Sequence, residues 1–313
     1  MATSAQPPHP APSLHPAPSL QPAPSLRPAP PLHVERGSGD TPGDGPLLLL
    51  LHGLAGTAAL WRPLVQTWSE RGGLPDWIAP DLPGHGRSAR RERYSFGAIA
   101  ADIGETLHEA GASERDVVVL GHSLGGAVGL VLSTGLFGVR VRRCCGVGVK
   151  LFFSDQDRAR GRALAAAPEK EFGTRAEAAQ FWLRIAGLSG LSGLSGLSGA
   201  VAPGATSAHD PLSYLPAGGL ADGAIVGTGT GTWRVAFDHA VNALGGVDAR
   251  ALLAHRAGRG ADVVLARGSA DRLVSDEDIR AVGLEPQVIA GAGHNVHVER
   301  PESIVDLVAA EFR

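Results

Sequence analysis

Short runs dominated by apolar residues alternate along the chain with longer segments whose apolar positions recur every three or four residues. In the segment 96–110, for example, Ile99, Ile103 and Leu107 share one helical face. Because strands that are apolar throughout are buried on both faces, the alternation predicts an α/β fold with a mostly parallel, doubly wound sheet. The pattern predicts strands at 47–51, 77–80, 117–120, 139–149, 262–266 and 287–290, and helices at 58–71, 96–110, 124–136 and 303–312.

Two segments depart from this pattern. Residues 1–30 repeat the sequence HPAPSL. Proline at this density removes amide donors and fixes φ, so we expect a disordered, Pro-rich tail. Residues 187–199 cycle through Gly, Leu and Ser with a period of three, which fits neither a helix nor a strand, so we expect a mobile loop.

The bulk composition narrows the class of protein. With 313 residues, of which 43% are hydrophobic, the chain is long enough for one large α/β domain with an inserted segment. A formal net charge of −3 provides no basic field for a polyanion, so we expect a small-molecule substrate and no nucleic-acid partner. We find no signal-peptide pattern, and the longest leucine run, 47–51, is too short to span a bilayer. We therefore expect a cytoplasmic protein with no membrane span.

The two cysteines, Cys144 and Cys145, are adjacent within a predicted strand. Neighbours in a strand point to opposite faces, so we expect two buried apolar side chains and no disulfide between them. Nothing in the sequence has the spacing of a metal site, and we expect neither a metal nor a cofactor.

Residues 117–126, VVVLGHSLGG, place Gly-x-Ser-x-Gly between an apolar strand and a helical pattern. That context is what a nucleophile elbow requires, a turn so sharp that the serine projects its hydroxyl from the C-terminal edge of the sheet. Gly121 and Gly125 are needed because a Cβ at either position would clash where strand and helix nearly touch. A chance motif in a chain with 43 glycines is the alternative, but the flanking elements favour Ser123 as the nucleophile.

An oxyanion hole needs two amides that converge on one point beside the nucleophile. One candidate is the N–H of Leu124, which follows Ser123 at the start of a helix. The second comes from the loop after an earlier strand, where HGLAG at 52–56 makes the N–H of Leu54 the candidate. His52 ends that strand, and we expect it to order the loop rather than to act as the base.

The base is expected late in the chain, where GAGH at 291–294 follows the last predicted strand. A histidine on such a loop can turn its imidazole towards the elbow. His294 is therefore our candidate base. For His297, which falls towards the final helix, we expect a loop-stabilising hydrogen bond.

The third member of the site is an acid that orients the imidazole and stabilises its charged form. Asp271 follows the strand at 262–266 and is our candidate. Asp276 and Asp278 lie where a helix begins and fit the roles of cap and first-turn acids. Asp155, after the strand at 139–149, is the other candidate acid.

Five segments in this order resemble the α/β-hydrolase superfamily, from about residue 32 to the end of the chain. They are LLLLLHGLAG at 47–56, APDLPGHGRS at 79–88, VVVLGHSLGG at 117–126, LARGSADRLV at 265–274 and GAGHNVHVERP at 291–301. The order serine, aspartate, histidine is that of the superfamily. The resemblance implies that Asp81, His85 and Ser88 hold a structural loop. It also implies two antiparallel strands before 47–51; residues 32–36 fit one, and we expect the other, which would fall in the proline repeat, to be missing.

The resemblance divides the chain into an α/β-hydrolase core at 31–149 and 241–313 and a helical cap at 150–240, inserted after the sixth strand. Residues 172–186 are the best candidate for a cap helix. The apolar cap residues would either roof the pocket or pack the cap itself; they are Phe152, Phe153, Phe181, Trp182, Leu183 and Trp233. We take Phe152, Phe181, Trp182 and Trp233 as candidate substrate-binding residues.

The resemblance and the triad together imply nucleophilic acyl transfer, with hydrolysis of a small-molecule carboxylic ester as the expected reaction. Hydrolysis of a carbon–carbon bond or a thioester, or transfer of the acyl group, would use the same triad and stay open. A protein of another class, which binds a small molecule on this fold without catalysis, is the alternative to an enzyme.

Overall fold

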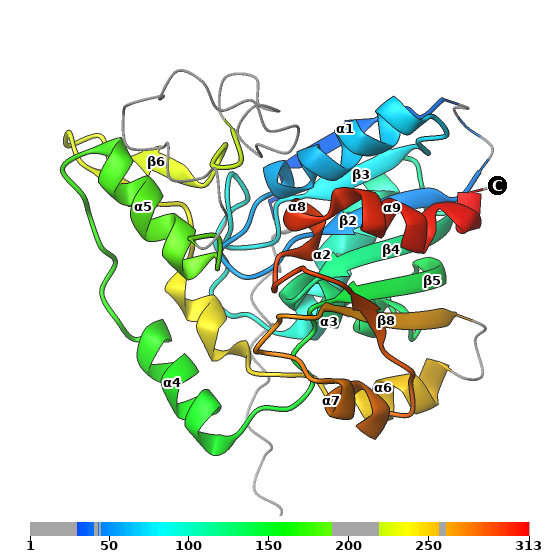
Figure 1. Cartoon of the computed structure of the whole chain (residues 1–313). Helices are drawn as coiled ribbons and strands as arrows, with labels where there is room; N and C mark the ends of the chain where they lie inside the picture. The colour runs from blue at the N-terminus through cyan, green and yellow to red at the C-terminus, as the bar shows by residue number, and fades with distance from the viewer. Residues whose placement is uncertain (1–29, 41–42, 44, 190–218, 257–260, 313) are drawn as a thin grey trace, which may run out of the picture. The chain divides into compact units, whose positions relative to one another are not determined.

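The computed structural model describes residues 30–40, 43, 45–189, 219–256 and 261–312. The predicted Pro-rich tail and most of the Gly-Leu-Ser cycle lie outside these residues. The folded unit, Pro31–Arg313, is built on a seven-stranded sheet of order β1-β3-β2-β4-β5-β8-β9 (Figure 1). Its strands are β1 (Val34–Gly37), β2 (Leu47–Leu51), β3 (Trp77–Pro80), β4 (Asp116–His122), β5 (Arg140–Val147), β8 (Asp262–Gly268) and β9 (Gln287–Ile289).

The predicted mostly parallel sheet is confirmed. Strand β1 runs antiparallel to β3 at one edge, and the other neighbouring strands pair in parallel. In the register of the central pair, Leu47 lies opposite Val117 and Leu51 opposite Gly121. The C-terminal ends of β2 and β4 therefore reach the same edge of the sheet, and the loops that follow them meet there.

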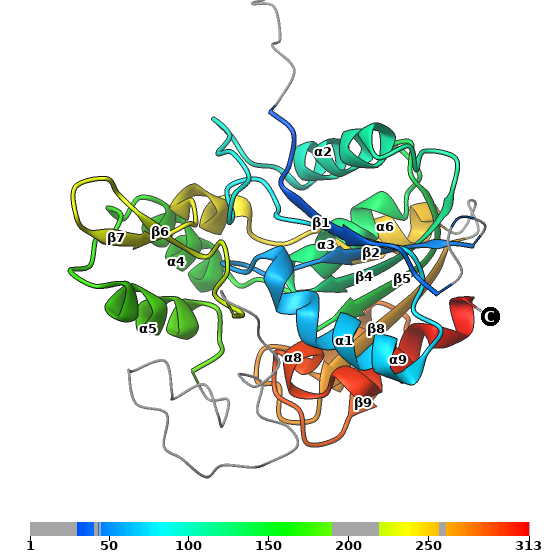
Figure 2. The ribbon, with the colours of Figure 1, turned by 90° about the horizontal axis from the view of Figure 1, so that it is seen from above.

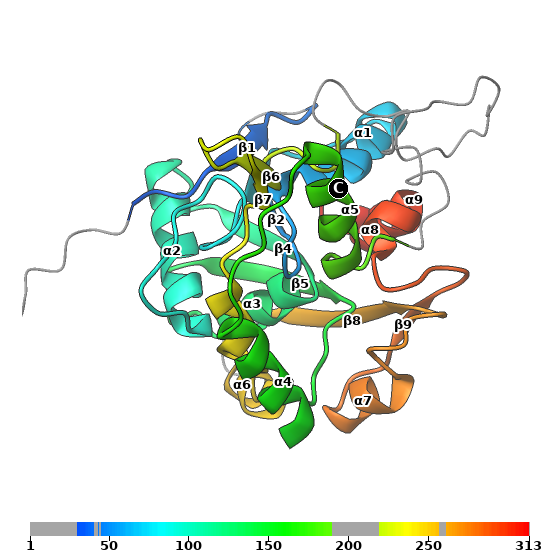
Figure 3. The same ribbon diagram turned by 90° about the vertical axis from the view of Figure 1, so that its left-hand side faces the viewer.

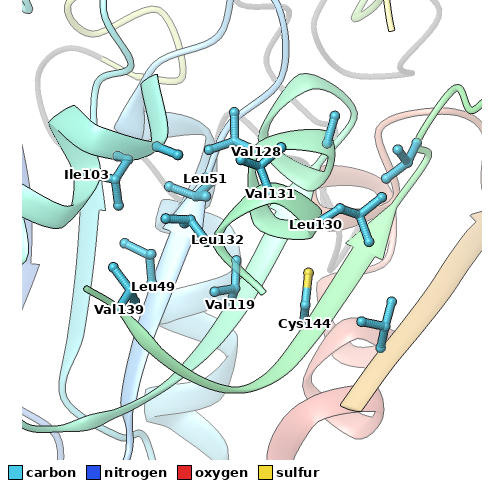
Figure 4. Close-up of a cluster of buried hydrophobic side chains, with 14 of the residues drawn as sticks. Leu49, Leu51, Ile103, Val119, Val128, Leu130, Val131, Leu132, Val139 and Cys144 are labelled. Carbon is cyan, nitrogen blue, oxygen red and sulfur yellow. The ribbon is translucent and has the colours of Figure 1, made fainter. Parts of the chain in front are cut away.

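Helices cover both faces of the sheet (Figure 2). One face carries α2 (Phe96–Glu109), α3 (Leu124–Leu132) and α6 (Ala249–Arg256), and the other carries α1 (Arg62–Arg71), α8 (Val296–Glu299) and α9 (Pro301–Val308). Because side chains alternate along a strand, Leu49 and Leu51 pack with α2 and α3 (Figure 4), whereas Leu48 and Leu50 belong to the core on the opposite face. All five leucines of β2 are buried, and each contributes about 1.5–3 kcal/mol of hydrophobic stabilisation.

The cysteines follow the same alternation. Cys144 is buried among the residues that face α3, and Cys145 is buried in the core on the other side of the sheet. The two side chains point to opposite faces, as their adjacency in a strand predicted.

The segment between β5 and α6, residues 148–248, is called the insertion from here on. It holds α4 (Asp155–Ala165), α5 (Arg175–Ile185), a hairpin of β6 (Ile225–Gly227) and β7 (Trp233–Val235), and the 3₁₀ helix η3 (His239–Leu244). Figures 1 and 3 show α4, α5 and the hairpin grouped beyond the ends of the sheet strands. The helical segment expected here thus also contains a two-stranded hairpin, which the Gly- and Thr-rich sequence around it did not reveal.

Several observed helices begin or end at other residues than predicted. Residues 58–61 form a 3₁₀ turn before α1, and residues 309–312 form another after α9. Helix α3 ends at Leu132, four residues earlier than predicted, because Gly135 at φ 71° turns the chain and the Ser133 hydroxyl bonds back to Gly129. None of the described helices is long and apolar enough to cross a membrane.

Candidate active site

Ser123 lies at the sharp turn between β4 and α3. Its backbone has φ 49° and ψ −111°, a conformation that non-glycine residues rarely adopt. Such a conformation costs about 1–3 kcal/mol and persists only where the surroundings enforce it. Here the Ser123 amide donates to the carbonyl oxygen of Val147 at 2.8 Å, and the Ser123 carbonyl accepts from Ala127 at 3.1 Å. The turn therefore has the geometry of a nucleophile elbow.

Three glycines allow the chain segments around Ser123 to approach one another. A Cβ on Gly121 would lie 2.5 Å from the carbonyl oxygen of Gly125, and a Cβ on Gly125 would lie 2.1 Å from that of Leu51. A Cβ on Gly53, in the loop after β2, would lie 2.5 Å from Nδ1 of His122. Real Cβ atoms essentially never lie this close to other heavy atoms, so glycine is required at these positions where the elbow meets β2.

The Gly125→Ala substitution is expected to lower the free energy of unfolding by about 3 kcal/mol or more, because the new methyl group collides with the backbone of a central strand. Urea unfolding measures this loss. The matched control is Gly45→Ala, since a Cβ at Gly45 meets no atom within 4 Å and its effect should stay within about 0.5 kcal/mol. A loss below about 1 kcal/mol for Gly125→Ala would show that the elbow tolerates a side chain.

The candidate base and acid form a hydrogen-bonded pair. Oδ2 of Asp271 lies 2.9 Å from Nδ1 of His294, and the Asp271 side chain is fully buried. Burial by itself would raise the pKa of Asp271. The hydrogen bond and the charge of His294, together with the hydrogen bond from the Leu273 amide at 2.8 Å, outweigh burial, so the pKa of Asp271 is lowered overall. Because an ionised carboxylate only accepts, Nδ1 of His294 donates to Asp271 in this pair.

Glu299, in α8, holds the loop that carries the candidate base. Its two carboxylate oxygens accept from the amides on either side of His294, from Gly293 at 2.6 Å and from Asn295 at 3.0 Å. His122 adds a third tie, since its Nε2 donates to the carbonyl oxygen of His294 at 3.0 Å. Sequence reasoning did not identify Glu299 or His122, although both belong to the motifs GAGHNVHVERP and VVVLGHSLGG that carry the resemblance.

The imidazole of His294 and the elbow meet at the end of β5. A Cβ on Gly148 would lie 3.1 Å from Nδ1 of His294, and the preceding residue, Val147, accepts the Ser123 amide. Within the described part of the chain, no hydrogen bond joins the Ser123 hydroxyl to His294. Bonds of this kind often tighten only when substrate is bound.

The two candidate oxyanion amides lie beside Ser123. Leu124 is the first residue of α3, so its N–H has no partner within the helix. Leu54 lies in the loop after β2, next to Ala55. Ala55, with φ 58°, and Ser123 are the described non-glycine residues that have a positive φ. Both leucines line the same cavity as Ser123.

This cavity, called the nucleophile pocket, has a volume of about 120 Å³. Ser123, Leu54, Leu124, Phe96 and Ala127 form its wall on the core side, and the opposite wall belongs to the insertion. The insertion contributes Lys150, Phe153, Val241, Asn242, Leu244, Gly245 and Gly246.

The candidate substrate-binding residues lie elsewhere. Phe152 is 43% exposed and Phe181 packs against Phe172. Trp182 is fully buried and donates from Nε1 to the carbonyl oxygen of Ala55 at 2.8 Å, which ties α5 to the loop after β2. Trp233, in β7, pairs with Phe172. None of the four lines the nucleophile pocket. Phe181 and Trp182 of α5 and Trp233 of β7 belong to a cluster in which the helix and the hairpin pack on each other. Phe153, one residue after Phe152, lines the pocket instead.

The other aspartates that we considered for the acid have structural roles or are exposed. Asp155 is a fully exposed first-turn residue of α4. Asp276 and Asp278 begin α7 (Asp276–Ala281), where Asp278 completes a capping box with Ser275 and Asp276 pairs with Arg267 at 2.5 Å. Asp276 and Asp278 are thus first-turn and capping residues, as predicted from the sequence.

His297 differs from its expected role. The predicted loop-stabilising hydrogen bond is wrong, since neither of its ring nitrogens has a partner among the described residues. The reason is its place in the first turn of α8, which faces the core. There the ring packs against Trp61 at 4.5 Å and against His122 at 4.4 Å between ring centroids. Burial lowers the pKa of His297 to about 3, so the ring is neutral.

His52 orders two loops. Its Nε2 accepts from the amide of Leu82 at 2.9 Å, so Nδ1 carries the proton and donates to the carbonyl oxygen of Gly53 at 2.8 Å. Burial lowers its pKa to about 4, despite the opposing effect of the hydrogen bond to Gly53. A neutral imidazole with both nitrogens engaged is a structural link rather than a base.

Residues 81–88 form a loop that contacts His52. Oδ1 of Asp81 accepts from Ala58 at 2.7 Å and Oδ2 from Arg87 at 2.9 Å, while the Ser88 hydroxyl donates to the Asp81 carbonyl at 2.6 Å. His85 stacks edge-on against His52 at 5.0 Å between ring centroids. These contacts hold a loop together, as the resemblance implied for Asp81, His85 and Ser88.

Comparison with known proteins shows the family of this chain. The model of the alpha/beta hydrolase family matches residues 48–307, and the chain therefore belongs to this family. Among solved structures, it is similar to the thioesterase domain from the curacin biosynthetic pathway (TM-score 0.64, 18% identity, 88% of this chain and 94% of that chain). It is also similar to E-2-(acetamidomethylene)succinate hydrolase (TM-score 0.62, 21% identity, 89% and 94%).

Curated relatives match a shorter stretch. The magnesium-chelatase 30 kDa subunit of Rhodobacter capsulatus is 39% identical over 94 residues, which cover 29% of this chain and 31% of that protein. The 2-succinyl-6-hydroxy-2,4-cyclohexadiene-1-carboxylate synthase of Yersinia pestis (strain Pestoides F) is 36% identical over 86 residues, 28% of this chain and 29% of that protein. The chain thus matches less than a third of the length of these relatives.

Proposed function

We propose that this protein hydrolyses small carboxylic esters through an acyl-enzyme on Ser123, with His294 as the base and Asp271 as the acid that orients it. The observation that carries the proposal is the combination of a strained serine at a helix start with a buried Asp271–His294 pair at the same sheet edge. Serine nucleophiles of this kind are recognised by geometry and role rather than by position in the chain.

The reaction proceeds in two halves. Nε2 of His294 takes the Ser123 proton as Oγ bonds to the carbonyl carbon, and the electron pair of the C=O bond moves to the oxygen, where the amides of Leu54 and Leu124 donate to it. The oxyanion then collapses, the bond to the alkoxide breaks, and His294 returns its proton to the leaving oxygen. Water, deprotonated by His294, releases the acid and restores the Ser123 hydroxyl.

Covalent labelling with a fluorophosphonate tests the proposal. The wild type should be labelled, the Ser123→Ala variant should not, and the control Ser69→Ala, which alters an exposed serine of α1, should be labelled like the wild type. An unlabelled wild type would favour a non-catalytic protein that binds a small molecule. A nucleophile pocket of about 120 Å³ holds a short acyl group, so butyrate esters should react faster than laurate esters of the same chromogenic alcohol.

Thioesters are the second candidate substrates, because a thioesterase domain is among the structural neighbours and the same triad cleaves both bonds. The rates on a butyrate ester and a butyrate thioester with matched leaving groups distinguish the two. Acyl transfer to an acceptor other than water would appear in the same assay as an acceptor-dependent product.

The Asp271→Asn substitution is expected to lower kcat/KM about 10³- to 10⁴-fold, because the amide no longer holds the proton on Nδ1 of His294 or stabilises the imidazolium. Steady-state kinetics on a butyrate ester measure the effect. Asp276→Asn is the control, since Asp276 pairs with Arg267 and makes no contact with His294. A rate within tenfold of the wild type for Asp271→Asn would assign the acid to another residue.

A further inference from the structure

A second cavity, called the arginine cavity, adjoins the nucleophile pocket. It has a volume of about 260 Å³ and lies between α4 and η3. The two cavities are neighbours, and the lining residues that they share are Leu54, a candidate oxyanion residue, and Phe153, Asn242, Leu244 and Gly245. A Cβ on Gly161 of α4 would lie 2.5 Å from the carbonyl oxygen of Asn242, so glycine is what lets the two helices approach this closely.

Three arginines of α4, Arg158, Arg160 and Arg162, line the arginine cavity. Neither Arg160 nor Arg162 has an ion-pair partner among the described residues, and the carboxylate nearest to Arg158 is Asp155 at 4.0 Å on the same helix. Among the residues that the structure describes, Asp157 is the acid that lines the cavity.

Asp157 does not neutralise these arginines. Its carboxylate pairs with Lys150 at 2.8 Å and accepts from the amide and hydroxyl of Ser154 at 2.9 and 2.8 Å. Those hydrogen bonds and the charge of Lys150 lower the pKa of Asp157, which stays ionised and engaged. The lining of the arginine cavity therefore has an excess of positive charge, although the formal net charge of the chain is −3.

We propose that the arginine cavity is a subsite for an anionic group, a carboxylate or a phosphate, on the ester or thioester that Ser123 attacks. The inference rests on the proposed hydrolase function and names its substrate class. Guanidinium groups pair with both anions through two parallel hydrogen bonds, and a cavity lined by several of them concentrates negative ligands. Because the arginines lie beyond the nucleophile pocket rather than in it, they select the substrate and take no part in bond cleavage.

Two matched pairs of substrates test the inference and locate the anion. On the acyl side, 4-nitrophenyl hydrogen succinate is compared with neutral 4-nitrophenyl butyrate; on the leaving-group side, butyryl-coenzyme A is compared with butyryl-N-acetylcysteamine. In one of the two pairs, kcat/KM for the anionic substrate should exceed that for the neutral one by about tenfold, and the ratio should fall as NaCl rises. The pair that shows the preference identifies carboxylate or phosphate as the ligand.

Variants separate the subsite from the catalytic machinery. In Arg160→Gln/Arg162→Gln the preference should drop to about one, with the rate on the neutral substrate unchanged. Arg175→Gln, an exposed arginine at the start of α5, should keep the preference. If kcat/KM is the same for the neutral and the anionic substrate in both pairs, the proposed subsite is wrong, whereas the hydrolase proposal still holds. Absence of turnover on all four substrates, together with no fluorophosphonate labelling, would overturn both.

Discussion

Replacing Ser123 by alanine is expected to lower kcat/KM for a butyrate ester by about 10⁴- to 10⁶-fold, because no other group at the elbow can form the acyl-enzyme. The amides of Leu54 and Leu124 remain, so a small residual rate above the uncatalysed reaction should persist. Alanine keeps the Cβ and the strained backbone of the elbow, so the urea midpoint should change little and loss of activity cannot be attributed to unfolding. Steady-state kinetics and urea unfolding on the same preparation measure both effects.

The paired variant Ser123→Ala/His294→Ala tests whether the two residues act as one unit. When nucleophile and base work in the same step, the second substitution costs almost nothing after the first. His294→Ala alone should therefore resemble both Ser123→Ala and the double variant. Additive losses, or a Ser123→Ala variant with more than about 1% of wild-type activity, would contradict the assigned mechanism.

The second large effect is a loss of stability in mild acid. Four histidines, His52, His85, His122 and His297, are buried beside the site, and burial is the main cause that lowers the pKa of each: to about 4 for His52, to about 3 for His85 and His297, and well below the usual value for His122. In the unfolded chain, histidine titrates near its ordinary pKa of about 6.5. Between pH about 6.5 and about 4, the unfolded chain therefore binds protons that the folded chain does not.

The sign follows from that difference in proton binding: the free energy of unfolding falls as the pH decreases through this window. His52, His85 and His297 each contribute a slope of about 1.4 kcal/mol per pH unit below the unfolded pKa, or roughly 2 kcal/mol at pH 5, and His122 acts in the same direction. Four such groups together approach the whole stability of a typical domain, about 5–15 kcal/mol. We expect the urea midpoint to decrease steeply between pH 7 and pH 5.

The His297→Phe substitution tests the assignment, since the His297 ring packs on Trp61 and His122 without a hydrogen bond among the described residues. Phenylalanine fills the same space without a titratable group, so the pH slope should decrease by the contribution of one proton. His108→Gln, at an exposed position of α2, controls for the removal of an imidazole as such. A stability that stays constant from pH 7 to pH 5 would mean that the buried rings are protonated in the folded state or accessible to water.

Much of the sheet and the candidate triad followed from local patterns. The leucines of β2 and the valines of β4 predict buried strands because every position is apolar, and Gly121 and Gly125 around Ser123 predict a turn that no side chain could fit. Asp271 and His294 follow β8 and β9 directly, and the C-terminal ends of parallel strands meet at one edge. The Asp271–His294 hydrogen bond is the consequence of that shared edge.

The element ends were harder to predict. Helix α3 ends where Gly135 reverses the chain, and the apolar pattern continues past that point without showing the turn. The hairpin of β6 and β7 has three residues in each strand, too few for periodicity to distinguish a strand from a loop.

The sequence by itself determined the order of the candidate catalytic residues along the chain: a candidate nucleophile, then a candidate acid, then a candidate base, each in a loop that follows a strand. Only the tertiary structure decided which residues of the insertion reach Ser123. Phe152 and Phe153 are neighbours with the same side chain, yet Phe153 lines the nucleophile pocket and Phe152 is 43% exposed. The packing of α4 on η3 places Arg160 and Arg162 on a cavity beside that pocket, a relation between distant segments that no spacing along the chain encodes.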